Sequence, residues 1–334
     1  MPKNIASLFS GCGGLDLGFS GGFVFRNTVC ERLDTNIVFA NDFDRDAWAC
    51  YNNNELLTND GVHSRLGDIR EIPTNEIPNF DILLAGFPCQ PFSISGNQKG
   101  FGDTRGTLFF DIARIVKYHK PKVILLENVK NLKAHNGGAT FNVISTVLKN
   151  LNYNIYYKVL NAKNFGLPQN RERIAIVCIR EDIDSGKFKF PKEYDNFITI
   201  SDIKEDDSKT KKYLITRSDI YINSEKLKDA IENGKVNKPV QIGIIGKGGQ
   251  GNRIYHENGI GITLAASSGG AASKTGAYYI NGKVRKLSPR EAARLQGFPE
   301  DFIIIDNETQ ALKQFGNSIP INLLKEVFSG LKDI

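Results

Sequence analysis

Short apolar runs rich in β-branched residues alternate with helix-compatible stretches through the first half of the chain. The expected strands read NIASLFS (4–10), NIVFANDF (36–43), DILLAGF (81–87), KVILLENV (122–129) and RIAIVCI (173–179). Residues 105–120 and 139–151 favour helices, because apolar side chains in the first of them recur on one helical face. Such alternation predicts an α/β fold with a mostly parallel sheet, in which ligands bind beyond the C-terminal strand ends.

The sequence changes character near residue 200. A charged stretch, 201–213, precedes glycine-rich segments at 242–255 and 262–279, which favour irregular strands and loops over helices. Ser288, Pro289 and Glu291 then predict a helix start, and the C-terminal segment is helical in pattern. We therefore expect a first domain over 1–199, a smaller loop-rich domain with its hinge over 200–304, and a segment over 305–334 that returns to the first domain.

Composition limits the function classes. The 334 residues carry a formal net charge of +6, which suits a polyanionic partner without requiring one. The five cysteines are scattered without a CxxC pair and do not cluster with the four histidines, so neither disulfides nor a metal site are expected. The sequence offers neither an apolar signal core at the N-terminus nor a membrane span, so we expect a cytoplasmic protein in a reducing compartment.

A glycine-rich turn follows the first expected strand. Gly11, Gly13 and Gly14 would let the backbone approach a ligand, but the dinucleotide pattern GxGxxG is not met, which argues against a pyrophosphate cofactor. Asp42 ends the second strand, where a carboxylate can accept both ribose hydroxyls, and Phe43 offers a face for adenine. Asp68 could accept a base amino group. Each is also compatible with an ordinary turn; their order along the chain favours an adenosine-containing cofactor.

Cys89 lies at the end of the third expected strand, in the sequence GFPCQPFS. A cysteine there could be buried and inert. The neighbouring prolines stiffen the loop, and Glu127 ends the next strand, where it could be a solvated acid or could face the same crevice. A thiol and a carboxyl group on adjacent strand ends form a plausible nucleophile and proton donor.

Two later segments of the sequence carry basic side chains that could bind a ligand. Arg171 and Arg173 precede the fifth strand and alternate in direction, so one of them could hold a carbonyl oxygen or the Glu127 carboxylate. Lys247, Gln250 and Arg253 lie on a glycine-rich loop, where Arg suits a guanine edge and Lys a phosphate. Surface charges and a solvated loop are the alternatives.

The ordered set of motifs resembles the DNA (cytosine-5)-methyltransferase family nearly end to end. The motifs are FSGCGGLDLGF, NDFD, GDIR, GFPCQPFS, DTRGTLFFDIARI, ENVKNL, QNRERI, RKLSPREAARLQGFP and QFGNSIP. The resemblance implies a Rossmann-like S-adenosylmethionine-dependent fold with a target-recognition domain. It implies that Cys89 adds to C6 of a flipped-out cytosine, that Glu127 contacts N3 and Arg173 contacts O2, and that Asn128 supports the same pocket.

The resemblance also implies a cofactor and DNA partner. The S-adenosyl-L-methionine positions would be Phe9, Gly11, Gly13, Gly14, Asp42, Phe43, Asp68, Ile69, Leu108, Asn317 and Ser318. The recognition segment is similar to family members that methylate the inner cytosine of GCGC. The expected DNA contacts are Ser95, Arg171, Lys247, Gln250, Arg253 and Thr263. Ser267 replaces a tyrosine of such an enzyme, and residues 200–236 match poorly, so a related GC-rich site is also possible.

These features predict a monomeric methyltransferase that modifies cytosine in double-stranded DNA. It would be the protective partner of a restriction–modification system, with a restriction endonuclease acting separately. Two alternatives stay open at this point: an RNA cytosine-5 methyltransferase on the same scaffold, and an inactive DNA-binding regulator.

Overall fold

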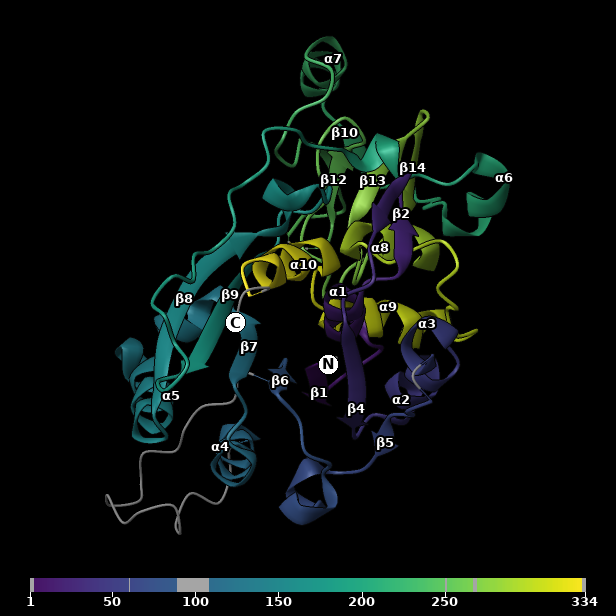
Figure 1. The fold of residues 1–334 in the computed structure, drawn as a ribbon. Coiled ribbons are helices and arrows are strands. Elements are labelled where there is room, and N and C mark those ends of the chain that lie inside the picture. Colours follow the sequence, from purple (N-terminus) through teal and green to yellow (C-terminus); the bar gives the residue numbers. More distant parts are fainter. Residues whose placement is uncertain (1–2, 60, 89–107, 250, 267–268, 332–334) are drawn as a thin grey trace.

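The computed structural model describes residues 3–59, 61–88, 108–249, 251–266 and 269–331 (Figure 1). Its central feature is a seven-stranded sheet in the order β5-β4-β1-β6-β7-β9-β8. The strands are β1 (Lys3–Leu8), β4 (Thr35–Asp42), β5 (Arg65–Leu66), β6 (Ile82–Ala85), β7 (Val123–Val129), β8 (Tyr153–Asn161) and β9 (Glu172–Arg180). Neighbours from β5 to β7 are parallel, whereas β9 runs antiparallel to both β7 and β8. The mostly parallel α/β sheet predicted from the sequence is therefore confirmed.

Helices cover both faces of this sheet. They are α1 (Gly14–Ser20), α2 (Arg45–Asn52), α3 (Glu55–Thr58), α4 (Leu108–His119) and α5 (Ala139–Asn150). One buried cluster joins α4 and α5 to alternate strand residues such as Leu83 and Ile124, and a second joins α1, α2 and α3 to residues such as Ile82 and Leu125. Because both faces are covered, the central strands are apolar at consecutive positions, which is why they were recognisable in the sequence.

A second sheet of five strands follows in the order β10-β11-β12-β13-β14. These strands are β10 (Ile220–Ile222), β11 (Gln241–Ile245), β12 (Arg253–His256), β13 (Ala277–Ile280) and β14 (Lys283–Lys286), and helices α6 (Asp207–Thr210) and α7 (Ser224–Glu232) accompany them. They form the upper part of the molecule in Figure 1. A small hairpin, β2 (Phe23–Phe25) and β3 (Thr28–Cys30), also lies outside the main sheet.

The chain then returns to the first sheet through α8 (Pro289–Gln296), α9 (Glu308–Asn317) and α10 (Ile321–Ser329). Ser288 and Glu291 form a capping box at α8, as the sequence predicts. The rings of Phe19 in α1 and Phe328 in α10 pack edge to face with centroids 3.9 Å apart. Leu295 and Phe298 join the same buried cluster, so α8 packs into the core that α1 and α10 share. The domain limits 1–199, 200–304 and 305–334 stay a prediction.

Within the described part of the chain, no helix combines the length and the apolarity that crossing a membrane requires.

Candidate active site

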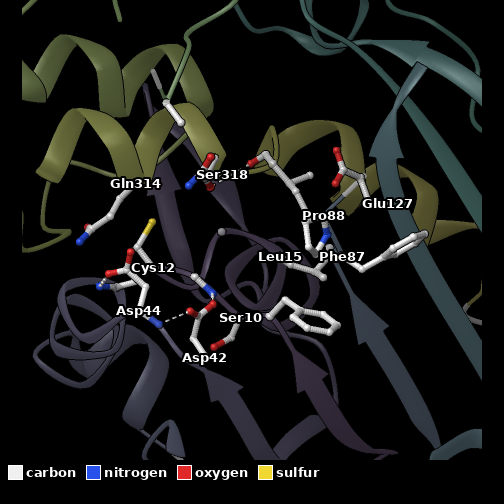
Figure 2. A pocket seen from close by; sticks show the side chains of 18 of the residues that line it. Ser10, Cys12, Leu15, Asp42, Asp44, Phe87, Pro88, Glu127, Gln314 and Ser318 are labelled. Atoms are coloured by element: carbon white, nitrogen blue, oxygen red, sulfur yellow. Dashed lines mark hydrogen bonds between the residues drawn. The ribbon is translucent and has the colours of Figure 1, made fainter. Parts of the chain in front are cut away.

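A cavity of about 810 Å³ opens at the C-terminal edge of the parallel strands (Figure 2). The residues that follow β1, β4 and β6 line it, as does the last part of β7. Because β9 is antiparallel, its first residues reach the same edge. Of the predicted site residues, the lining includes Phe9, Gly11, Gly14, Asp42, Phe43, Asp68, Ile69, Leu108, Glu127, Asn128, Arg171, Arg173, Asn317 and Ser318.

The glycine turn between β1 and α1 forms the floor of this cavity. Gly11 has a φ of +56°, and a Cβ built on it would have no atom within 4 Å, so the backbone there leaves room for a ligand. Gly13 differs: it caps α1 with a φ of +88°, and a Cβ there would lie 2.3 Å from Leu57 Cδ1. Gly13 is absent from the cavity lining, and its lack of a side chain serves the packing of α3.

Asp42 points its carboxylate across this turn. The backbone N–H groups of Gly11 and Asp44 donate to its two oxygens, each at 2.8 Å. The side chain is buried, and this burial raises the pKa of Asp42, which the two hydrogen bonds oppose. Phe43 beside it is 72% exposed and presents its ring. Each carboxylate oxygen keeps acceptor capacity for a ligand hydroxyl.

Asp68 lies further along the same wall. Its carboxylate accepts from the backbone N–H of Arg70 at 3.0 Å and pairs with the Arg70 guanidinium, which lowers the pKa of Asp68. Ile69 is buried beside it, and Leu108 at the start of α4 is half-buried. An apolar slot with one acceptor at its edge suits a purine ring.

Glu127 and Arg173 form an ion pair at the other end of the cavity. They come from the paired strands β7 and β9, and Arg173 Nε lies 2.9 Å from Glu127 Oε1. Both side chains are buried, at 8% and 12% exposed, respectively. Burial raises the pKa of Glu127, and the positive charges of Arg173 and Arg171 oppose this shift. A carboxyl group whose pKa is raised is suited to donate a proton near neutral pH.

Asn128, the neighbour of Glu127, forms a hydrogen bond to the segment that precedes the predicted nucleophile in the sequence. Its Nδ2 donates to the Phe87 carbonyl oxygen at 2.9 Å, and its Oδ1 accepts from the Val129 N–H at 2.8 Å. Pro88 also lines the cavity and directly precedes Cys89. Cys89, Ser95 and Gln250 lie outside the described residues. The other four cysteines are buried and free.

Comparison with known proteins decides the family. Residues 3–333 match the C-5 cytosine-specific DNA methylases. The chain belongs to this family. It is 43% identical over 320 residues to Type II methyltransferase M.HhaI from Haemophilus parahaemolyticus, covering 96% of this chain and 91% of that one. It is 41% identical over 323 residues to M.SsoII from Shigella sonnei, covering 96% and 77%, respectively.

Solved structures agree on the fold. A mutant of DNMT2 from Spodoptera frugiperda superposes with a TM-score of 0.71 at 19% identity, over 98% of this chain and 99% of that one. A putative prophage DNA modification methyltransferase from E. coli superposes with a TM-score of 0.64 at 20% identity, over 99% of each chain. These structures show the fold, and the family match shows the activity: the protein is a DNA cytosine-5 methyltransferase on the Rossmann-like scaffold, as the motifs predict.

The prediction that Arg171 contacts DNA needs correction, because the side chain is buried inside the methylase. The side chain is 1% exposed. Its guanidinium donates to the carbonyl oxygens of Leu264 at 3.0 Å, Gly316 at 2.8 Å and Ser318 at 2.7 Å. Burial lowers the pKa of Arg171 well below its ordinary value. Arg171 thus holds the end of α9 against the segment around Leu264, which leaves its Nη groups little capacity for DNA.

The other described residues predicted to contact DNA lie at the surface of the methylase. Lys247 in the turn after β11 and Arg253 at the start of β12 are exposed. Thr263 is exposed as well, and its hydroxyl donates to the Asn170 carbonyl oxygen at 2.6 Å, which leaves the hydroxyl oxygen able to accept. These positions are accessible to a large partner, and their roles stay predictions.

Sequence reasoning missed several residues that line the methylase cavity. Lys313 in α9 donates to Asp44 Oδ2 at 2.7 Å, which fastens α9 to the turn that carries Asp42. Cys12 and Gln314 also line the cavity. Asp44 caps the N-terminus of α2. The sequence could have predicted this role, because an acidic residue directly before a helical pattern is a typical N-cap. Lys313 and Gln314 carry no such local signal.

One buried acid in the methylase should make stability depend on pH. Asp16 in α1 is 0% exposed, its Oδ1 accepts from Ser7 Oγ at 2.5 Å, and burial raises its pKa to about 7. Because the folded protein holds this proton above the unfolded pKa near 4, stability should fall as pH rises from about 4 to 7. Asp16→Asn cannot ionise, so it should be more stable than the unaltered protein at pH 8, by up to about 4 kcal/mol, and by a smaller margin, about 1.7 kcal/mol, at pH 5.

Urea unfolding at pH 5 and pH 8 measures this difference. Asp229→Asn, on the exposed surface of α7, is the matched control and should leave the pH dependence unchanged. Parallel pH curves for Asp16→Asn and the unaltered protein would contradict the assignment.

Proposed function

We propose that this methylase transfers a methyl group from S-adenosyl-L-methionine to C5 of a cytosine flipped out of duplex DNA. The proposed target is a short site, GCGC or a related GC-rich sequence. The observation that carries the proposal is one continuous cavity with two chemically different ends. Asp42 and Phe43 suit a nucleoside at one end, while Glu127 and Arg173 suit a base at the other.

The described residues fit the cofactor. Gly11 leaves open space where a side chain would stand, the Asp42 carboxylate faces the cavity, and Phe43 exposes its ring beside it. When bound, the cofactor would supply an electrophilic methyl group on a sulfonium. Asp42 would accept from the ribose hydroxyls, and Phe43, Ile69 and Leu108 would enclose the adenine, with Asp68 at its edge. Phe9, Gly14, Asn317 and Ser318 would complete the walls, and Gly13 would shape the turn.

At the other end, the chain's own residues would activate the base. The Cys89 thiolate would form a bond to C6, while protonated Glu127 donates its proton to N3 and Arg173 donates a hydrogen bond to O2. This addition turns C5 into a nucleophilic enamine carbon. After methylation, a water molecule would take the C5 proton, the C6–S bond would break to release Cys89 as the thiolate, and N3 would return its proton to Glu127, which restores the aromatic ring. Flipping is required because these atoms are inaccessible within the stacked duplex.

DNA would bind across the five-stranded sheet and the cavity mouth. Arg253 would read a guanine edge, Lys247 and Thr263 would contact phosphates, and Gln250 and Ser95 would approach the gap left by the flipped base. We further propose that the enzyme acts as a monomer and protects DNA from a separate restriction endonuclease. Similarity to Type II methyltransferases supports this role and favours DNA over an RNA substrate.

The proposal predicts the result of one cellular experiment. Bisulfite sequencing of plasmid DNA from cells expressing the chain should show protected cytosines confined to one short sequence. Cys89→Ala should abolish the protection, because the proposed addition to C6 requires the Cys89 thiolate. Cys30→Ala, which removes a buried thiol of β3, is the control and should retain the pattern. Full methylation by Cys89→Ala would contradict the mechanism, and protection at a different sequence would overturn GCGC alone. Unprotected DNA from the unaltered chain would favour an inactive regulator.

A further inference from the structure

Gln314 is a buried polar side chain that the mechanism above does not use. It lies in α9, is 6% exposed and lines the cavity. Neither its Nε2 nor its Oε1 has a hydrogen-bond partner within the described part of the chain. A buried amide without partners is costly, so nearly all such groups in folded proteins are satisfied by protein, water or ligand.

Its position on α9 relates it to the proposed cofactor site. Gln314, Asn317 and Ser318 are spaced i, i+3, i+4 and therefore share a helix face. The Ser318 N–H donates to the Gln314 carbonyl oxygen at 2.8 Å, so the end of the helix is held in this register. A Cβ on Gly14 would lie 2.3 Å from Ser318 Oγ, which places this end of α9 directly against the glycine turn.

The surroundings of Gln314 leave its amide available. Figure 2 shows its side chain extending from α9 on the side of the cavity where Cys12 and Asp44 are drawn. Lys313 and Asp44, the nearby charged groups, are already paired at 2.7 Å. The neighbouring polar groups are thus engaged with one another, while both amide atoms of Gln314 remain without a partner.

We propose that Gln314 binds the amino-acid end of the cofactor, with Nε2 donating to its carboxylate and Oε1 accepting from its ammonium group. This inference rests on the proposed function. A planar amide with a free donor and a free acceptor matches a ligand group that has both, and an α-amino acid carries them on adjacent atoms. The adenine edge has the same combination, so a comparison with adenosine, which lacks the amino-acid end, distinguishes the two.

Gln314→Met tests this role because methionine has a similar shape and no amide. Affinity for S-adenosylhomocysteine, measured by calorimetric titration without DNA, should fall about 10- to 100-fold, as expected for hydrogen bonds to charged groups. Affinity for adenosine, which lacks the amino-acid end, should be unchanged. The ligand-free melting temperature should stay the same or rise, since an unpartnered buried amide is removed.

Gln296→Met is the matched control. Gln296 is also fully buried, but its Nε2 donates to the Phe315 carbonyl oxygen at 2.5 Å and its Oε1 accepts from Gln169 at 3.2 Å. Its replacement should lower the ligand-free melting temperature, as a structural amide would.

Three results would overturn the inference: unchanged affinity for S-adenosylhomocysteine, an equal loss for adenosine, or a lowered ligand-free melting temperature in Gln314→Met. If the unaltered protein bound no S-adenosylhomocysteine, the proposed cofactor would fail with it. Normal binding by the unaltered protein together with normal binding by Gln314→Met would overturn the role of Gln314 alone.

Discussion

Replacing Glu127 with glutamine should lower the rate constant of methyl transfer by about 10²–10⁴-fold, the range typical of a lost general acid. Glutamine keeps the shape of the side chain and can donate a hydrogen bond to N3, but it cannot transfer a proton. Single-turnover kinetics with a duplex oligonucleotide measures the effect. S-adenosylhomocysteine binding checks that the variant is folded, because Arg173 is left without its counter-charge.

The pH profile distinguishes an acid from a structural role. Burial raises the pKa of Glu127 and Arg173 opposes that shift. Since the protonated form is the active one, the rate should fall as pH rises through this pKa. Arg173→Met removes the opposing charge, so the pKa should rise further and the fall should move to higher pH, at a lower maximal rate.

Glu181→Gln is the control for both variants. Glu181 is an exposed carboxylate just beyond the far end of β9, the strand that begins beside Arg173. It should retain both the rate and the pH profile. A Glu127→Gln enzyme within a few-fold of the unaltered rate would remove Glu127 from the proton transfer.

The parallel core of this fold was predictable because its strands are buried on both faces. The central strands of the sheet, such as β6 and β7, are apolar at nearly every position, and such runs are visible without tertiary information. Strand β8 was missed. It is an edge strand that exposes Tyr157 and Val159 beside polar neighbours, so its sequence lacks both a continuous apolar run and a regular alternation.

Much of the candidate site was predictable for a topological reason. Asp42 is the last residue of β4 and Glu127 lies near the end of β7, and the ends of such parallel strands meet at one edge of the sheet. The part that escaped prediction depends on contacts between distant segments. Arg171 reaches carbonyl oxygens 93 and 145 residues away in the chain, and its neighbours in sequence give no sign of them. The free amide of Gln314 likewise follows from what α9 packs against.

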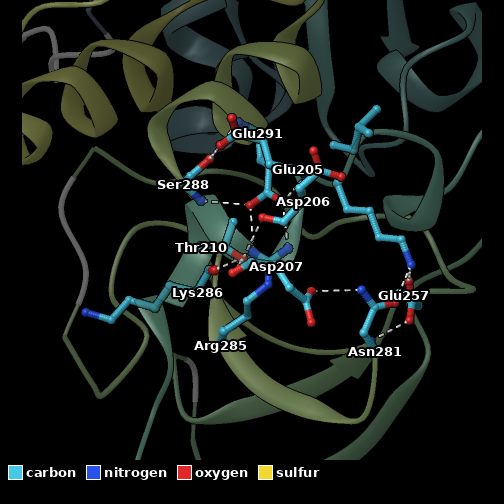
Figure 3. Close-up of polar contacts among 12 residues, drawn as sticks. Glu205, Asp206, Asp207, Thr210, Glu257, Asn281, Arg285, Lys286, Ser288 and Glu291 are labelled. Atoms are coloured by element: carbon cyan, nitrogen blue, oxygen red, sulfur yellow. Dashed lines mark hydrogen bonds and ion pairs between the residues drawn. The ribbon is translucent and has the colours of Figure 1, made fainter. Parts of the chain in front are cut away.

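The second large effect concerns stability and involves the contact between the five-stranded sheet and α8. Arg285 in β14 and Glu291 in α8 form a two-pronged ion pair, with both nitrogen–oxygen distances at 2.7 Å (Figure 3). The side chains are 2% and 0% exposed. The Glu291 carboxylate also accepts from the backbone N–H groups of Ser288 and Glu205, each at 2.8 Å. It is the common acceptor for three segments.

Arg285→Met should therefore lower the free energy of unfolding by about 3–5 kcal/mol, because it leaves a buried carboxylate without its counter-charge. Lys283→Met is the control on the same strand. Lys283 pairs with Asp207 at 3.1 Å, but both side chains are largely exposed, so this change should cost less than about 1 kcal/mol. Chemical unfolding of the two variants gives the comparison.

Replacing both members of the buried pair, Arg285→Met with Glu291→Leu, should cost less than the sum of the two single changes, since no isolated charge remains. It should not restore full stability, because the N–H groups of Ser288 and Glu205 then lose their acceptor. A cost for Arg285→Met no larger than that of Lys283→Met would mean that water reaches Glu291 and replaces the guanidinium. In that case the pair would not hold β14 to α8.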